Sequence, residues 1–169
     1  MLLWAADDAH ERLELGIGAA ALCPSAFLLG MGAVRAFGAP LILTRSREGL
    51  FRSASLVAIG AFALYRVADT APLAIAALVL VGIGVGMLYP LSLSGAMSAA
   101  PGLEAQASTR SALASGLAVG SGPLALGALA DLSSVALASW IVVALLVAAI
   151  AASPFTTRRA SRRPAPAET

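Results

Sequence analysis

Long runs of uncharged residues dominate this sequence. Residues 70–103, 111–130 and 132–157 contain no Asp, Glu, Lys or Arg. A helix needs about 20 mostly apolar residues to cross the hydrocarbon core of a bilayer. Only 12% of the 169 residues are charged, against about 25% in an average soluble domain. So few charges would leave large apolar patches on a soluble globule, so the sequence predicts an integral membrane protein.

Five segments reach or approach the length of a membrane span. They cover residues 15–42, 50–68, 71–97, 108–130 and 133–152. Backbone hydrogen bonds in lipid must be closed within the protein, and these segments lack the strict alternation of barrel strands. The expected fold is therefore an all-α membrane protein, with five transmembrane helices within residues 15–155.

The arginines predict how these helices are oriented. All 11 basic residues are Arg. If the chain crosses the membrane at each of the five segments, only Arg12 and Arg66 lie on one side of it. The other nine lie on the opposite side: Arg35, Arg45, Arg47, Arg52, Arg110, Arg158, Arg159, Arg162 and Arg163. Because cytoplasmic loops carry an excess of Arg and Lys, we expect an extracytoplasmic N-terminus and a cytoplasmic C-terminus in the cell (inner) membrane.

The two ends of the chain are more polar than its middle. Residues 1–14 are predicted to be the end of a truncated helix followed by an extracytoplasmic loop, with Trp4 as an interfacial anchor. Residues 156–169 are basic and contain proline, which predicts a disordered cytoplasmic tail. Five spans after an outside N-terminus without a signal sequence indicate that an upstream part is missing.

Composition argues against several functions. A net charge of +2 is too small for a nucleic-acid partner. One cysteine, Cys23, and one histidine, His10, cannot supply a zinc site, so we expect no metal and no cofactor. The spans contain no His, and no acid away from their ends, so they lack the paired groups that an intramembrane enzyme needs. The chain is therefore not expected to be an enzyme.

Glycine, proline and a few polar residues form patterns in three of the segments. In the first segment, Gly32 and Gly38 flank Arg35 ahead of the basic stretch that contains Arg45, Arg47 and Arg52. The third contains Gly82, Gly84, Gly86, Tyr89, Pro90, Ser92 and Ser94, and the fourth contains Gly116, Gly120, Gly122, Pro123, Gly127 and, at its outer end, Asp131. Gly82 and Gly86 have the spacing that lets two membrane helices approach closely. We expect Gly120, Gly122 and Gly127 also to pack against another helix.

These three patterns resemble motifs of the major facilitator superfamily of secondary transporters. The resemblance aligns the chain with helices eight to twelve of a twelve-helix transporter, a partial C-terminal bundle, and places residues 1–6 at the end of helix seven. It implies that the glycines and prolines serve helix packing and gating, and that residues 50–68 and 133–152 face lipid. It also implies a small-molecule substrate and a missing N-terminal half. The resulting candidates for the substrate path are Arg35, Tyr89, Ser92 and Ser94.

A second interpretation remains open. The chain could be a small stand-alone membrane protein that acts through homo- or hetero-oligomerisation, without transport of its own. In either case the lipid bilayer is its immediate partner.

Overall fold

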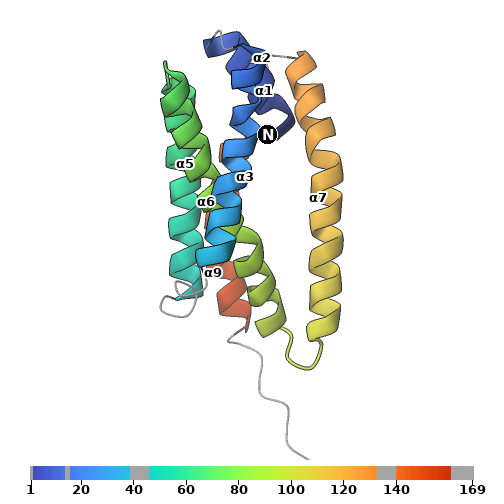
Figure 1. Ribbon diagram of the computed structural model, residues 1–169. Helices are drawn as coiled ribbons and strands as arrows, with labels where there is room; N and C mark the ends of the chain where they lie inside the picture. The colour runs from blue at the N-terminus through green and yellow to red at the C-terminus, as the bar shows by residue number, and fades with distance from the viewer. Residues whose placement is uncertain (1, 14–15, 39–45, 133–139, 161–169) are drawn as a thin grey trace, which may run out of the picture.

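The computed structural model describes residues 2–13, 16–38, 46–132 and 140–160, and all of the regular structure in them is helical (Figure 1). The helices are α1 (Leu2–Leu13), α2 (Ile17–Ala20), α3 (Leu22–Phe37), α5 (Arg47–Val67), α6 (Ala71–Ser98), α7 (Glu104–Leu132) and α9 (Ile141–Ala160). The prediction of an all-α protein is confirmed for the described residues.

Four helical stretches are long and apolar enough to cross a membrane. They are Gly18–Phe37, Arg47–Val67, Ala71–Ser98 and Glu104–Leu129, which supports a membrane-embedded protein. The described part of the predicted fifth span, 133–152, contains the apolar helical stretch Ile141–Ala151. The first seven residues of that predicted span, 133–139, lie outside the described residues.

Helix ends follow local signals in the sequence. Ser46 caps the start of α5 by accepting a hydrogen bond from the Gly49 N–H at 3.3 Å, which satisfies one of the free amides of the first turn. The turn between α6 and α7 contains Gly102 at φ +78°. That left-handed conformation favours glycine.

Helix α6 is the centre of the bundle, with α3 and α5 packed along it. A Cβ atom on Gly82 would overlap the carbonyl oxygen of Phe27 in α3 and lie 3.0 Å from the backbone nitrogen of Met31. On the α3 side, a Cβ on Gly30 would overlap the carbonyl oxygen of Val79. The backbones of α3 and α6 are therefore in direct contact. Gly86 extends this contact, because its Cβ would lie 3.2 Å from the Cα of Met31.

Gly84 brings α6 equally close to a second neighbour, α5. Its Cβ would lie 2.7 Å from the carbonyl oxygen of Ala54 and 2.9 Å from the Cβ of Ala58. Residues two apart on a helix point about 160° away from each other. Gly82 and Gly84 can therefore serve helices on opposite sides of α6. Pro90 lies within α6 without ending it.

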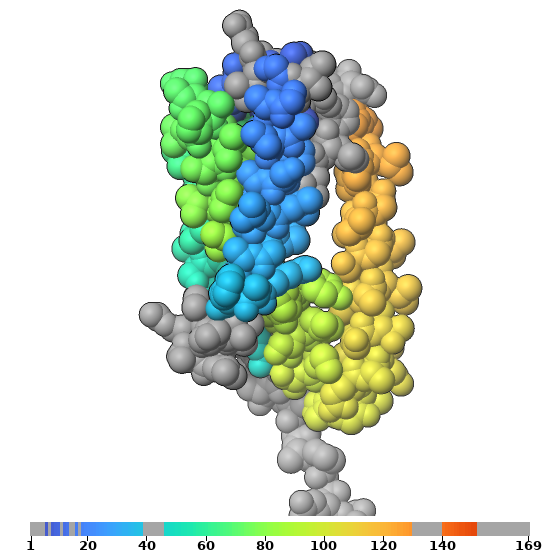
Figure 2. All heavy atoms as spheres, in the orientation of Figure 1, coloured from blue at the N-terminus to red at the C-terminus, as the bar shows by residue number. Residues whose placement is uncertain are grey.

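Helix α7 contacts α6 less extensively than α3 and α5 do. Only 6% of the most apolar 18-residue stretch of α7 is buried inside the chain, against 44% of the corresponding stretch of α6. Figure 2 shows open space between α3 and the middle of α7. A Cβ on Gly116, Gly120 or Gly122 would meet nothing within 4 Å.

Gly120 and Gly122 therefore have no helix neighbour among the described residues, and their packing against another helix stays a prediction about a helix outside this part of the chain. The close-contact surface of α6 is already occupied by α3 and α5, so neither of its glycine faces is left for α7. The third glycine of that prediction, Gly127, is partly buried, and the neighbouring Leu126 is 6% exposed.

The ends of the chain also differ from the prediction. Residues 7–13, expected as a loop, continue helix α1, because Asp8 and Arg12 pair one turn apart and Ala9 is fully buried. Helix α9 continues to Ala160, into the predicted tail of residues 156–169, while residues 161–169 lie outside the described part.

The resemblance implied that residues 50–68 face lipid, which holds for one side of α5 only. Leu56 and Val57 are exposed, whereas Ala54, Ala58 and Phe62 are buried. Phe62 contacts Trp140 edge-on at the start of α9, with 5.8 Å between ring centroids.

The glycine contacts yield a matched pair of substitutions. Gly82→Ala should lower the free energy of unfolding by about 1–3 kcal/mol, the usual cost of overpacking. Gly120→Ala should be neutral or stabilising by up to roughly 1 kcal/mol, because alanine has the higher helix propensity. Reversible unfolding in mixed detergent micelles, followed by circular dichroism, measures both. Equal destabilisation by the two substitutions would contradict this packing.

Candidate functional site

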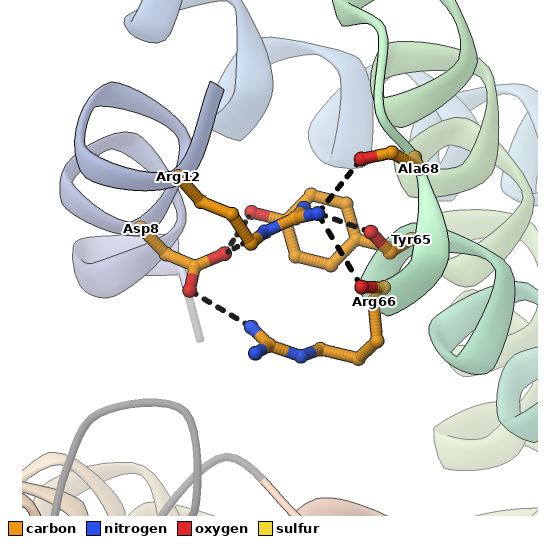
Figure 3. A network of polar contacts seen from close by, with 5 residues as sticks. All are labelled: Asp8, Arg12, Tyr65, Arg66 and Ala68. Carbon is orange, nitrogen blue, oxygen red and sulfur yellow. Dashed lines mark hydrogen bonds and ion pairs between the residues drawn. The ribbon is translucent and has the colours of Figure 1, made fainter. Parts of the chain in front are cut away.

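A cluster of charged and polar side chains joins α1 to the C-terminal end of α5 (Figure 3). Asp8 and Arg12 come from α1, and Tyr65 and Arg66 come from the last turn of α5. The charged side chains are largely buried: the exposed fraction is 13% for Asp8, 15% for Arg66 and 23% for Arg12. We call these four residues the end network.

Arg12 binds carbonyl groups at the C-terminal end of α5. Its Nη1 donates to the Ala68 carbonyl at 2.8 Å and to the Arg66 carbonyl at 3.4 Å, and its Nη2 donates to the Tyr65 carbonyl at 2.8 Å. The last four carbonyls of a helix lack partners within that helix and carry its partial negative charge. A cation placed there, partly buried, stabilises a helix by up to about 2 kcal/mol.

The same guanidinium lies over the ring of Tyr65, with its carbon 4.9 Å from the ring centroid. The negative face of an aromatic ring attracts a cation within about 6 Å. Arg12 is thus held from two directions, by carbonyl oxygens and by the ring (Figure 3).

Asp8 supplies the negative charge of the end network. Its Oδ2 accepts a hydrogen bond from the Tyr65 hydroxyl at 2.7 Å, and its Oδ1 accepts one from Arg66 Nη1 at 2.8 Å. Oδ2 also lies 3.5 Å from Arg12 Nε. One carboxylate therefore balances two guanidinium groups in a partly dehydrated place, where an unpaired charge is costly.

Few features of the amino-acid sequence indicate the end network. Arg12 and Arg66 stood out only as the two arginines on the minority side of the membrane, and Asp8 was assigned no role. One local signal was present, since Asp8 and Arg12 have the four-residue spacing of a helical ion pair. The partners in α5 lie 53 to 58 residues further along the chain, and no local pattern reveals them.

The predicted substrate-path residues lie elsewhere, on α3 and α6. Arg35, Tyr89, Ser92 and Ser94 are all exposed, and Tyr89 has 42% of its surface accessible. Ser92 lies about 60° around the helix from Tyr89, whereas Ser94 points about 160° away from Ser92. Ser92 can share a face with Tyr89, and Ser94 cannot.

The predicted motif around Arg35 is brought together only in part. A Cβ on Gly38 would overlap the carbonyl oxygen of Val34 and lie 3.2 Å from Met87 Cε of α6, so Gly38 is closely packed. Gly32 has open space around it. Arg45 and its neighbours in residues 39–45 lie outside the described residues, and so does the side chain of Asp131.

The basic stretch instead contributes a contact at the end of the bundle opposite to the end network. Arg47 Nη2 donates to Ser98 Oγ at 3.2 Å, and Ser98 Oγ donates to the Ser94 carbonyl at 2.8 Å. Arg52 pairs with Glu48 one turn away at 2.7 Å. Arg47 thus approaches the C-terminal end of α6 as Arg12 approaches that of α5.

Within the described residues, no three His, Cys, Asp or Glu side chains are grouped in a way that could hold a metal ion. The groups of the end network bind one another and the carbonyls at the end of α5, which is the chemistry of a structural contact.

Comparisons with known proteins identify no relative. No protein-family profile matches the chain, and no curated protein or solved structure is detectably similar to it. The resemblance to facilitator motifs therefore depends on the residues quoted above.

The end network predicts different outcomes for the same substitution at two tyrosines. Tyr65→Phe removes the hydroxyl that donates to Asp8 but keeps the ring under Arg12, so the free energy of unfolding should fall by about 1.5–3 kcal/mol, as for other hydrogen bonds to charged groups. Tyr89→Phe, at an exposed site, should change it by less than about 0.5 kcal/mol. Denaturant unfolding in micelles measures both variants. If the Tyr65→Phe and Tyr89→Phe variants were equally stable, the Tyr65 hydroxyl would not contribute to the stability of the end network.

Proposed function

We propose that this chain is the C-terminal part of an alternating-access transporter of the major facilitator type, and that it supplies one wall of a small-molecule path. The observation that carries the proposal is the exposure of α7, whose 26-residue apolar stretch Glu104–Leu129 has only 6% of its most apolar part buried inside the chain. A membrane helix rich in glycine is suited to close contact with another helix. Its open glycines, Gly116, Gly120 and Gly122, find no such neighbour here.

The other half of the transporter is the proposed occupant of this open side. In transporters built from two repeats, the substrate site lies near the bilayer midplane between the halves, and one half moves against the other. The chain would then contribute Tyr89 and Ser92 of α6, with Arg35 of α3, to a path that the missing N-terminal half completes. Gly82 and Gly86 would keep α3 and α6 together as one rigid wall during this motion.

A stand-alone protein that assembles with itself is the second candidate, and the same open face of α7 favours it. The two candidates differ in what the neighbouring DNA encodes. The proposal expects an upstream in-frame sequence with seven further hydrophobic spans, whereas self-assembly expects none. Cross-linking of the 169-residue chain in membranes provides a second test, because a Gly120→Leu substitution should abolish a dimer formed through α7.

The arginine distribution gives the proposed orientation, with both termini assigned as in the sequence analysis. Alkaline phosphatase fused after Ser46, between α3 and α5, should be inactive because that side is cytoplasmic. Fused after Asp69, between α5 and α6, it should be active. Green fluorescent protein at the same two positions should give the opposite pattern. An active phosphatase after Ser46 would reverse the orientation.

Transport assays in liposomes test the proposal directly. The chain alone should show no saturable uptake of sugars, drugs or organic acids, because one wall cannot seal a site from each side in turn. Together with the half encoded upstream, Tyr89→Ala and Ser92→Ala should each lower uptake at least about tenfold, the effect of losing one group that contributes about 1.4 kcal/mol.

Ser94→Ala is the matched control for this assay, since it removes the same hydroxyl from the opposite side of α6. It should leave uptake unchanged. Saturable, substrate-specific flux from the 169-residue chain alone would overturn the proposal and favour a self-assembling transporter.

A further inference from the structure

Arg35 lies well inside the length of α6 that spans the membrane. Its neighbour Val34 fixes the level, because a Cβ atom on Gly86 would lie 2.7 Å from Cγ1 of Val34. Beyond Gly86, α6 continues to Ser98, past the end of α3 (Figure 1), over about 18 Å at a rise of about 1.5 Å per residue. A helix of 28 residues centred on a hydrocarbon core of about 30 Å extends roughly 6 Å past it at each end. The backbone at Arg35 is therefore about 10 Å inside the hydrocarbon region.

No carboxylate of the described side chains is at this level. Those that the structure describes lie at the ends of the bundle, on Asp8, Glu48, Asp69 and Glu104. The ion pairs among the described residues use Arg12, Arg52 and Arg66, and Arg35 takes part in none of them. A charged side chain at membrane depth is costly unless it meets an anion, water or the polar interior of a bundle. Arg35 therefore requires an anionic partner from outside the described part of the chain.

Tyr89 projects from α6 on the same flank as Arg35 does from α3. The two helices run in the same direction, as the colours of Figure 1 show. Each residue advances about 100° around a helix, so Arg35 points about 100° clockwise from Val34, viewed from the N-terminal end. In the same view, Tyr89 points about 60° anticlockwise from Gly86. Val34 and Gly86 face each other, and these opposite rotations lead to one flank of the helix pair.

We propose that Arg35 and Tyr89 form an anion-binding site inside the membrane, and that the small molecule of the proposed path carries a carboxylate or phosphate group. Both side chains are exposed on that flank. A guanidinium presents a fork of N–H donors that matches either group, and the phenol hydroxyl adds one more donor. The identity of the substrate rests on the proposed function, whereas the site itself is a property of this chain.

A lipid headgroup offers the same phosphate chemistry but fits the position less well. Headgroups lie outside the hydrocarbon core, whereas the backbone at Arg35 is about 10 Å inside it. To reach a headgroup, the Arg35 side chain would have to extend along α6 past Tyr89. A soluble anion that enters a water-filled path is therefore the proposed ligand.

Charge-selective labelling of a thiol beside this site tests the proposal without transport. Cys23→Ala removes the single cysteine, and Ser92→Cys introduces a thiol next to Tyr89 in the full chain, placed in phosphatidylcholine nanodiscs. The thiol is labelled by an anionic reagent, methanethiosulfonate ethylsulfonate, and by a cationic one, methanethiosulfonate ethyltrimethylammonium. A fixed positive charge in a cleft raises the local concentration of anions about tenfold or more. Arg35→Gln should therefore lower the ratio of the anionic to the cationic rate about tenfold.

The ratio reports local charge, because a change in the ionisation of the thiol affects both rates equally. Arg52→Gln is the matched control: it removes an exposed arginine that pairs with Glu48 and should leave the ratio unchanged. A second control places the thiol on the opposite side of α6 with Ser94→Cys. There, Arg35→Gln should have no effect on the ratio.

Binding of an anion is measured in the same chain. Succinate or inorganic phosphate, added at matched ionic strength, should slow the anionic labelling of the Ser92→Cys thiol, and Arg35→Gln should abolish this protection. In nanodiscs that contain phosphatidylglycerol, the effect of Arg35→Gln on the ratio should persist. Loss of that effect would indicate that a lipid headgroup occupies Arg35, and would overturn the soluble ligand.

Two results would overturn the site itself: failure of both reagents to reach the Ser92→Cys thiol, or a ratio that Arg35→Gln leaves unchanged. The proposed function can fail separately. Selective labelling and protection by anions, without uptake by the two halves together, would keep the anion site and refute the transport proposal.

Discussion

Close approach of backbones at the glycines of α6 is the contact on which the rest of this structure depends. Lipid tails are as apolar as the side chains, so the hydrophobic effect does little to bring helices together in a bilayer. Dispersion contacts replace it, and they fall off within about an ångström of added separation. Gly82 and Gly86 bring α3 against α6, and Gly84 brings α5 against it. A side chain at any of these positions would separate the helices and remove the contacts of a whole interface.

Charged side chains contribute to the bundle in a different way from the glycines, because they make their contacts at the ends of the helices. Arg12 binds the carbonyls that end α5, and Arg47 reaches Ser98 at the end of α6. A helix in lipid cannot leave its last carbonyls without partners, and an arginine satisfies several at once while opposing the partial negative charge there. Glycine contacts thus hold the middle of the bundle, and the arginines fix the ends of neighbouring helices relative to each other. The end network also includes a largely buried acid, Asp8, which accepts hydrogen bonds from two side chains of α5.

Much of the fold was predictable from the uncharged runs, because the length of an apolar helix follows from the thickness of the bilayer. The glycine spacing was less informative. Gly116 and Gly120 have the same spacing as Gly82 and Gly86, yet one pair has open space and the other lies against α3. Spacing indicates that a close approach is possible, whereas the presence of a neighbour depends on tertiary structure. Asp8 was missed for a related reason: residues 7–13 are too polar for a span, and the α5 contacts that stabilise them as a helix lie more than 50 residues away.

The exposed face of α7 links the packing to the proposed function. Leu113, Leu117 and Val119 project from a helix that includes Gly116 and Gly120, and all three are more than 60% exposed. Large and small residues alternate along such a face, so it has ridges and grooves against which a second helix can pack. Lipid chains can cover the same face, but fluid chains do not require fixed glycine positions. If a transporter half occupies this side, its helices must contact α7 where Gly116 and Gly120 leave space. Gly120→Leu would then weaken association with that half while leaving the contacts among α3, α5 and α6 unchanged.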